Sequence, residues 1–432
     1  MRVIPWNPER WRPLFFTIWG GQIFSLLGSH LVQFALVWWL TDTTGSATVL
    51  AIGMMFALIP QIVATPFAGA LVDRWNRRWV MIVADGGIAL ATAVLAVLFA
   101  LDVIQIWHIY ALVFVRSLGG AFHWATMQAS TSMMVPEVHL TRVAGLNQTL
   151  AGVANIVSPP MGALLIVLIP MQGILAIDFV TAILAIVPLL FIAIPQPAPS
   201  GEREAERPHL LRDVVEGLRF LWHRSGLLVI IAIATILNLL AVPAFSLMPI
   251  YVKNHFGGGA LQLATIQAMW GIGLIGGGLL LAAWGGFKRR IVTGMLALAL
   301  QGIGIAVLGF TPAHLFWLAV GAALFAGLMN PIFNGSIMAT LQTTVPHAMQ
   351  GRVFALVLSG AQAMSPLGLA VAGPVADRFG IQLWYLLAGF ASTAMGIAAL
   401  FVPAVLRVES TAKSLKDEEK AVDADAADAR PS

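Results

Sequence analysis

Long, uninterrupted apolar runs recur along this chain and constrain its fold more than any other feature. Twelve stretches of about 20 or more residues are predominantly apolar, and a run of about 20 residues is the length at which an α-helix crosses a bilayer. Hydrocarbon offers no partner to backbone N–H and C=O groups, so only helices and closed barrels span it. Because these runs do not alternate between apolar and polar residues, they predict helices and argue against an outer-membrane barrel.

The runs fall into two sets of six. The spans are expected at 14–40, 48–72, 79–101, 106–131, 143–168 and 174–194, and then at 227–251, 261–284, 290–310, 314–338, 352–374 and 381–405. We therefore expect an all-α membrane protein of twelve transmembrane helices in two six-helix halves. Its parts are an N-terminal segment (1–13), the first half (14–194), a linker (195–226), the second half (227–406) and a tail (407–432).

Three of these boundaries carry further expectations. The first apolar run is longer than the core of a signal peptide, about 7–15 residues, so we expect it to be retained as a helix. The linker begins rich in Pro and then alternates charges, which predicts a surface segment with a short helix around 210–222. The tail is acidic and Ala-rich, a composition typical of disorder or loose helix.

Composition supports a membrane protein. Hydrophobic residues make up 59% of the chain and charged residues 10%, whereas soluble domains carry about 25% charged residues. The chain has no cysteine, which excludes disulfides, thiolate metal sites and cysteine nucleophiles.

Basic residues are distributed asymmetrically about the predicted spans. If both termini are cytoplasmic, every Lys and Arg except Arg116, Lys253 and Arg378 falls in a cytoplasmic segment. Cytoplasmic loops are enriched in Lys and Arg, so the pattern predicts an even number of spans in the cell membrane with both termini inside. The net charge of +4 then reflects topology, and no nucleic-acid partner is expected.

An internal repeat relates the two halves. Val135-Pro136 is followed by Arg142-Val143, and Val345-Pro346 is followed at the same spacing by Arg352-Val353, each time between the fourth and fifth predicted helix of its half. Parallel repeats of this kind are typical of transporters whose substrate site lies between the halves.

Several motifs resemble those of a known family. Gly69-Ala70-Leu71-Val72-Asp73-Arg74-Trp75-Asn76-Arg77-Arg78, between the second and third spans, resembles the G-x-L-x-D-R-x-x-R-R signature of the major facilitator superfamily. Further stretches at 39–47, 116–123 and 135–141 resemble its macrolide-efflux branch, and the similarity runs from about Ile18 to Leu406.

The resemblance implies export of a bulky amphiphilic drug by proton antiport, with the two halves rocking to give alternating access. It also implies that the loop motif, represented by Gly69, Asp73, Arg74, Arg77 and Arg78, is a conformational latch at the cytoplasmic face. The alternative is a basic loop that sets topology, with a carboxylate that caps a helix. The second half lacks the acid in its counterpart, 284–290, and has Ala326 where the repeat offset would place a second Arg116.

Ionisable residues inside spans are costly and mark functional sites. Arg116 lies within the fourth predicted helix, Asp85 within the third and Asp178 within the sixth, and these three are the proton-coupling candidates. In the superfamily that the motifs resemble, the matching Arg is tied to proton coupling. The alternative for each is a structural ion pair or hydrogen bond. No Asp or Glu lies between Glu216 and Asp377, so a proton carried by an acid would use the first half, where Asp42 and Asp102 are weaker candidates.

Polar residues also recur on one face of several spans. The candidate cavity residues are Gln22, Ser29 and Gln33 in the first helix, His123 in the fourth, Gln148 and Asn155 in the fifth, and Asn330 and Asn334 in the tenth. Polar faces of apolar helices turn away from lipid, and in the resembled superfamily these helices line the central cavity. For any one residue, a helix–helix hydrogen bond is the alternative, and His30 and His123 are further possible proton relays.

Catalytic motifs are missing from the sequence. No HExxH, P-loop or Ser-hydrolase motif occurs, and the single GxGxxG at 271–276 lies in an apolar run without a preceding strand. We expect no enzyme, cofactor or metal. The expected partners are the lipid bilayer, a small-molecule substrate and protons, and the chain is expected to be a monomer. The alternatives are export of a siderophore or metabolite and, in a different class, a non-transporting membrane assembly factor.

Overall fold

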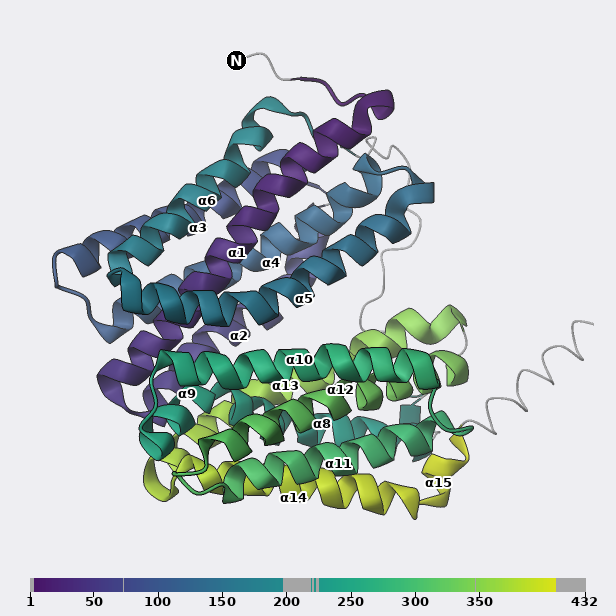
Figure 1. Ribbon diagram of the computed structural model, residues 1–432. Coiled ribbons are helices and arrows are strands. Elements are labelled where there is room, and N and C mark those ends of the chain that lie inside the picture. Colours follow the sequence, from purple (N-terminus) through teal and green to yellow (C-terminus); the bar gives the residue numbers. More distant parts are fainter. Residues whose placement is uncertain are drawn as a thin grey trace, which may run out of the picture. The chain divides into compact units, whose positions relative to one another are not determined.

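A computed structural model describes residues 4–72, 74–196, 219, 221–222, 225–345 and 347–408 (Figure 1). The first eight elements are η1 (Pro8–Arg10), α1 (Trp11–Thr44), α2 (Ala47–Val72), α3 (Arg77–Ala100), α4 (Ile106–Met134), α5 (Glu137–Leu168), α6 (Met171–Phe191) and α8 (Ser225–Ser246). The remainder are α9 (Met248–Ile250), η2 (Tyr251–His255), α10 (Ala260–Trp284), α11 (Arg290–Phe310), α12 (Phe316–Thr344), α13 (His347–Phe379), α14 (Ile381–Leu400) and α15 (Pro403–Leu406). Most of the predicted surface helix at 210–222, and the tail beyond residue 408, lie outside the described residues.

The long helices confirm the all-α membrane fold. Ten helices among the described residues are both long enough and apolar enough to cross a bilayer. The two other long helices, α4 (29 residues) and α13 (33 residues), match the length. They are more polar, since α4 contains Arg116 and two His, and the first turns of α13 contain His, Gln and Arg. A count of twelve spans therefore includes these two polar helices.

Proline changes the boundaries of two predicted spans. The seventh, expected at 227–251, is interrupted at Leu247, and the chain continues as α9 and η2. Pro249 lies at the start of α9, where its missing N–H costs nothing. The twelfth, expected at 381–405, ends at Leu400, because Val402 precedes Pro403 and takes extended angles. The first span is longer than expected and begins at Trp11.

The chain divides into two compact units. The first comprises Met1–Arg203, Phe245–Ala268 and Leu369–Ile381, and the second comprises Glu204–Ala244, Met269–Gly368 and Gln382–Ser432. In the first unit, α1 packs against α5 and α6, α2 packs against α4, and α3 packs against α4 and α6 (Figure 1). In the second unit α11 packs extensively against α12. The first unit thus includes two short segments, Phe245–Ala268 and Leu369–Ile381, that follow the linker in sequence. The division into halves at 14–194 and 227–406 stays a prediction.

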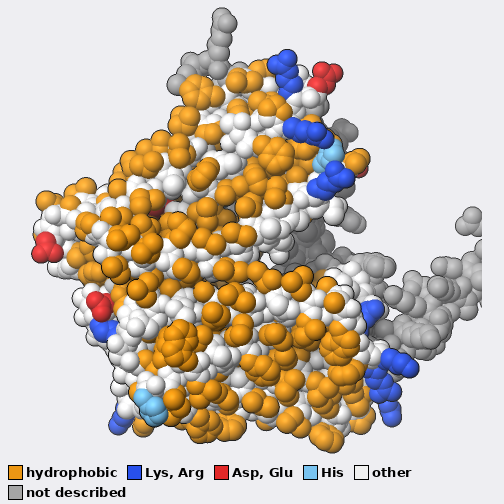
Figure 2. Space-filling view, in the orientation of Figure 1, with side chains coloured by type: hydrophobic (Ala, Val, Ile, Leu, Met, Phe, Trp, Pro, Cys, Tyr) orange, Lys and Arg blue, Asp and Glu red, His pale blue; other side chains and the backbone are white. Residues whose placement is uncertain are grey.

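Much of the visible surface is apolar. Hydrophobic side chains occupy most of the face seen in Figure 2, and Lys and Arg gather at helix ends. Large side chains such as Phe67, Leu90 and Phe401 are more than half exposed along or at the ends of these helices. Apolar exposure on this scale marks a membrane-facing surface.

Candidate functional site

A close approach of α1 to α6 positions the first part of the site. A Cβ added at Gly28 would lie 3.1 Å from Asp178 Oδ1 and 3.2 Å from its Cα. Glycine has no Cβ, so the backbone of α1 comes near the carboxylate without a clash. Ser29, the next residue in α1, donates to the same carboxylate from Oγ to Oδ1 at 3.2 Å.

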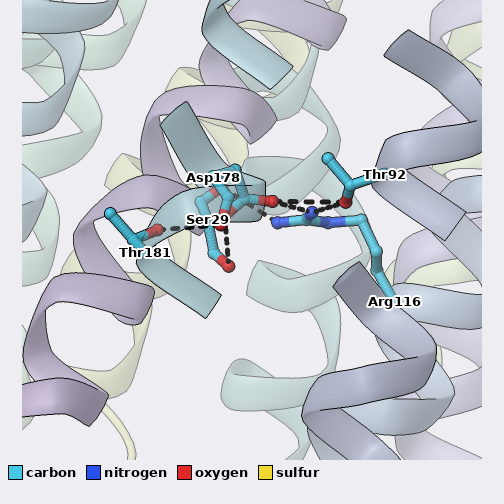
Figure 3. A network of polar contacts seen from close by, with 5 residues as sticks. All are labelled: Ser29, Thr92, Arg116, Asp178 and Thr181. Atoms are coloured by element: carbon cyan, nitrogen blue, oxygen red, sulfur yellow. Dashed lines mark hydrogen bonds and ion pairs between the residues drawn. The ribbon is translucent and has the colours of Figure 1, made fainter. Parts of the chain in front are cut away.

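Arg116 and Asp178 form a buried ion pair (Figure 3). Arg116 Nη1 donates to Asp178 Oδ2 at 2.5 Å, and the two side chains are 10% and 2% exposed. The same Nη1 donates to Thr92 Oγ1 at 2.8 Å, and Thr92 Oγ1 donates to Asp178 Oδ2 at 3.3 Å. Thr181 Oγ1 donates to the backbone oxygen of Asp178 at 2.9 Å. Helices α1, α3, α4 and α6 therefore meet at one satisfied pair of charges.

Asp85 sits in a second, weaker network. Gln22 Nε2 donates to Asp85 Oδ2 at 3.1 Å, and His123 Nε2 lies 3.6 Å from Asp85 Oδ1. The His123 ring nitrogen is 2.8 Å from Gln22 Oε1. Because the Gln22 amide nitrogen faces Asp85, its oxygen accepts from His123, whose Nε2 carries the hydrogen in this arrangement. The Asp85 side chain is 6% exposed and that of His123 is 22% exposed.

These two networks border a single polar cavity in the first unit. Its volume is 420 Å³. Six of the residues singled out from sequence line it together: Gln22, Ser29, Gln33, Asp85, Arg116 and His123. His30 also lines it, whereas Asp178 lies behind Arg116, outside the lining. Asp178 thus contacts the cavity lining through Arg116 and Ser29, while Asp85 lines the cavity directly.

Four predicted cavity residues lie elsewhere. Gln148 and Asn155 are exposed on α5 and do not line the 420 Å³ cavity. Asn330 and Asn334 belong to the second unit. There Asn334 Nδ2 donates to the backbone oxygen and to Oδ1 of Asn330, both at 3.1 Å.

Two arginines of the loop motif between α2 and α3 contact neighbouring helices in this structure. Arg77 Nη1 donates to the carbonyl of Ala129 at 2.8 Å, and Arg78 Nη2 donates to the carbonyl of Leu190 at 2.5 Å. Arg78 Nε also donates to the carbonyl of Leu189. Leu189 and Leu190 lie in the last turn of α6, where a cationic donor stabilises the C-terminus of the helix. Ala129 lies before the last turn of α4, so Arg78 caps α6 whereas Arg77 connects the start of α3 to α4.

The rest of the motif is exposed or undescribed. Gly69 and Arg74 are exposed, and Asp73 lies outside the described residues. The structure describes Arg77 and Arg78 but not Asp73, the acid of the motif. The latch role of the motif therefore stays a prediction.

Sequence reasoning missed several residues of the site. Gln61, Ser117 and Trp124 line the cavity, and Thr92 bridges the ion pair. Gln61, a polar residue inside an apolar helix, could have been found by the rule that found Gln22. A lone Thr such as Thr92 carries no such signal, because Thr hydroxyls in helices commonly bond the preceding turn. No group of three or more His, Cys, Asp or Glu residues that could hold a metal occurs in the described part of the chain.

Comparison with known proteins identifies the family of this chain. The Major Facilitator Superfamily profile matches residues 18–369. Macrolide efflux protein A of Streptococcus pyogenes is 33% identical over 382 residues, which cover 88% of this chain and 94% of that protein. Multidrug efflux pump Tap of Mycolicibacterium fortuitum is 29% identical over 401 residues, covering 89% of this chain and 95% of that protein.

Solved structures share the fold at low sequence identity. A bacterial homologue of the iron transporter ferroportin in an inward-facing state matches with a TM-score of 0.66 at 14% identity, covering 89% of this chain and 98% of that one. A D-xylose-proton symporter matches with a TM-score of 0.64 at 13% identity, covering 89% and 95%. The chain is a membrane transporter that belongs to the major facilitator superfamily, in its macrolide-efflux branch.

Proposed function

We propose that this transporter exports amphiphilic, macrolide-like molecules from the cytoplasm in exchange for protons, by alternating access. The observation that carries the proposal is the Asp85 carboxylate at the wall of a polar cavity, bonded to Gln22 and near His123. The relatives named for macrolide and multidrug efflux support the substrate class. The positive-inside pattern supports placement in the cell membrane with both termini cytoplasmic.

Asp85 is suited to take up and release a proton. Protonation turns the carboxylate from an acceptor into a donor, and the Gln22 amide can meet either form because it carries both N–H donors and an oxygen. When Gln22 reverses, its oxygen accepts from protonated Asp85 and its nitrogen donates to His123 Nε2. His123 Nε2 must then be the ring nitrogen without a hydrogen, so the His123 ring changes tautomer. Proton exchange at Asp85 therefore rearranges the hydrogen bonds among Asp85, Gln22 and His123.

Arg116 and Asp178 keep their charges in this proposal. Asp178 accepts hydrogen bonds from Arg116, Thr92 and Ser29, and the Arg116 guanidinium is the counter-charge of its carboxylate. Neutralising it would leave the Arg116 guanidinium buried without its counter-charge, which costs several kcal/mol. The pair fixes the positions of α1, α3, α4 and α6 around the cavity, so its part in proton coupling is indirect.

The cavity is suited to part of an amphiphilic substrate. Its 420 Å³ falls in the range of small-molecule sites, about 300–1,000 Å³. Gln22, Ser29, Gln33 and His123 provide hydrogen-bonding groups beside apolar neighbours. In the proposal, Gln148, Asn155, Asn330 and Asn334 supply further polar contacts during transport, and the loop motif with Gly69, Asp73, Arg74, Arg77 and Arg78 switches conformation.

The test is export of a radiolabelled macrolide from cells, with and without an uncoupler. We expect export that the uncoupler abolishes, and loss of that export in Asp85→Asn at unchanged protein level. Asp102→Asn, which changes a weaker candidate acid in the α3–α4 turn, is the matched control and should export normally. Uncoupler-sensitive export by Asp85→Asn at the parental rate would remove Asp85 from the mechanism. Failure to move any macrolide or dye would favour a siderophore or metabolite exporter or a non-transporting assembly factor.

A further inference from the structure

The turn between α1 and α2 is held by a carboxylate from far along the chain. Asp377, near the end of α13, accepts from the backbone N–H of Ala47 at 2.6 Å, from that of Thr48 at 2.9 Å and from Ser46 Oγ at 2.8 Å. The first N–H groups of a helix have no partner within it, and the helix dipole favours an anion there. Asp377 therefore caps α2 from a position 330 residues along the chain from Ala47.

A second set of contacts holds the other side of the same turn. Lys253 Nζ, in η2, lies 3.0 Å from Asp42 Oδ1 and also donates to the carbonyls of Thr41 and Asp42. Asn254 Nδ2 donates to the carbonyl of Gly45 at 2.9 Å. Gly45 ends α1 in the left-handed conformation, with φ +61°, so it presents this carbonyl at a sharp turn.

Helix α13 also packs closely against the backbone of α2 at Gly373. A Cβ added at Gly373 would lie 2.9 Å from Ala51 Cβ and 2.9 Å from Thr48 Cα. All of these residues belong to the first compact unit. Capping, ion pairing and close backbone packing thus converge on one turn, from two segments that follow the linker.

The sequence around Asp377 repeats part of the loop motif. Gly373-Pro374-Val375-Ala376-Asp377-Arg378 has the Gly-x-x-x-Asp-Arg spacing of Gly69 to Arg74. One copy ends α2 and the other ends α13. In the proposed topology these two ends face opposite sides of the membrane, with Asp377 and the α1–α2 turn on the exterior.

We propose that Asp377, supported by Lys253 and Asn254, is an exterior latch that holds the α1–α2 turn against α13 and η2 and opens once in each transport cycle. The contacts are reversible hydrogen bonds and one exposed ion pair, so they can break and reform without covalent change. A two-state contact of this kind provides the bistable element that alternating access requires. The inference rests on the proposed function for its cycle, but the state of the latch can be measured without transport.

The test uses the absence of native cysteine. Ala51 is 2% exposed at the α2–α13 contact, so a single cysteine introduced by Ala51→Cys reports separation of the two helices. In proteoliposomes, a membrane-impermeant maleimide should label it slowly, and Asp377→Asn should speed labelling by about fivefold or more as the open population grows. Ala68→Cys, in a fully buried position of the same helix, should label slowly in both backgrounds, and Asp102→Asn should not change the Ala51→Cys rate.

Equal labelling of Ala51→Cys in the Asp377→Asn and parental backgrounds would overturn the latch. Faster labelling without export of any macrolide would keep the latch and reject the proposed function, so the two failures are distinguishable. If Asp377→Asn does not fold, the pair Asp42→Cys and Lys253→Cys decides instead. Joining it with a short bis-thiosulfonate should stop export until a reductant is added, and undiminished export by fully cross-linked protein would contradict the proposal.

Discussion

Asp85 and Asp178 are both buried carboxylates in the first unit, and they differ in what surrounds them. Asp178 is 2% exposed and receives three side-chain donors, one of them the Arg116 guanidinium. Asp85 is 6% exposed, receives one amide donor and borders the cavity beside a His. Their burial is nearly the same, so burial does not distinguish them. The partners do, because an ion pair in a medium of low dielectric is costly to break whereas an amide can reverse.

The largest expected effect follows from removing the acid of the ion pair. Asp178→Asn leaves Arg116 buried without a counter-charge, and losing one partner of a buried pair costs about 3–5 kcal/mol. We expect low expression and a clearly reduced Tm of the purified protein in detergent.

The double variant Arg116→Gln with Asp178→Asn sharpens this result. It removes both charges, so most of the lost stability should return while export stays impaired. A Tm for Asp178→Asn equal to that of the parent would contradict the structural role assigned to the pair.

The second-largest effect is expected for Asp85→Asn, which should reduce transport with little change in stability. Asp85→Asn keeps a polar side chain beside Gln22 and His123, so its Tm should change little. Active export should fall about 10²-fold, the smallest contribution usual for a positioned proton-transfer group. Initial rates of macrolide export from energised cells, divided by protein level, measure it. If Asp85→Asn loses stability as Asp178→Asn does, the contrast between the two acids is wrong.

His123→Gln should reduce export less. Glutamine retains an N–H that can donate to the Gln22 oxygen, but it removes the ring that changes tautomer when Gln22 reverses. We expect a several-fold lower export rate with macrolide binding retained, measured by equilibrium binding and by export on the same preparation. An unchanged rate would confine the exchange to Asp85 and Gln22.

The smallest effect is expected at the bridge between the charges. Thr92→Val removes the hydroxyl that joins Arg116 to Asp178, and a hydrogen bond to charged groups contributes about 1.5–3 kcal/mol at most. Because the direct ion pair remains, we expect the free energy of unfolding to fall by an amount near the lower end of this range. Export should be normal. Thr149→Val, which removes an exposed hydroxyl bonded to the Gly145 carbonyl on α5, is the matched control outside the pair and the cavity, and it should keep stability and export.

The membrane spans and the ionisable residues of the candidate site could be predicted from the sequence. Hydrocarbon penalises charges and unpaired backbone groups so strongly that spans, and ionisable residues within them, stand out without a structure. That rule found Asp85, Arg116 and Asp178, and helical spacing grouped Gln22 with Ser29 and Gln33.

Partner choice could not be read in this way. Sequence alone left open which acid pairs with Arg116, because the pairing depends on how α3, α4 and α6 rotate about their axes. The role of Thr92 has no pattern of its own. From sequence, Asp377 stands out only as the first acidic residue after Glu216. Its contacts could not be predicted, because its partners Ala47 and Thr48 lie in another helix.

Proton movement measured directly tests the central claim, that Asp85 exchanges protons while Asp178 stays paired. The purified protein is reconstituted in liposomes that contain a pH-sensitive dye, and a macrolide gradient is imposed with no starting pH difference. The parental protein should move protons against the macrolide, and Asp85→Asn should move macrolide without any pH change in the lumen. Proton counterflow by Asp85→Asn at the parental rate would contradict the account.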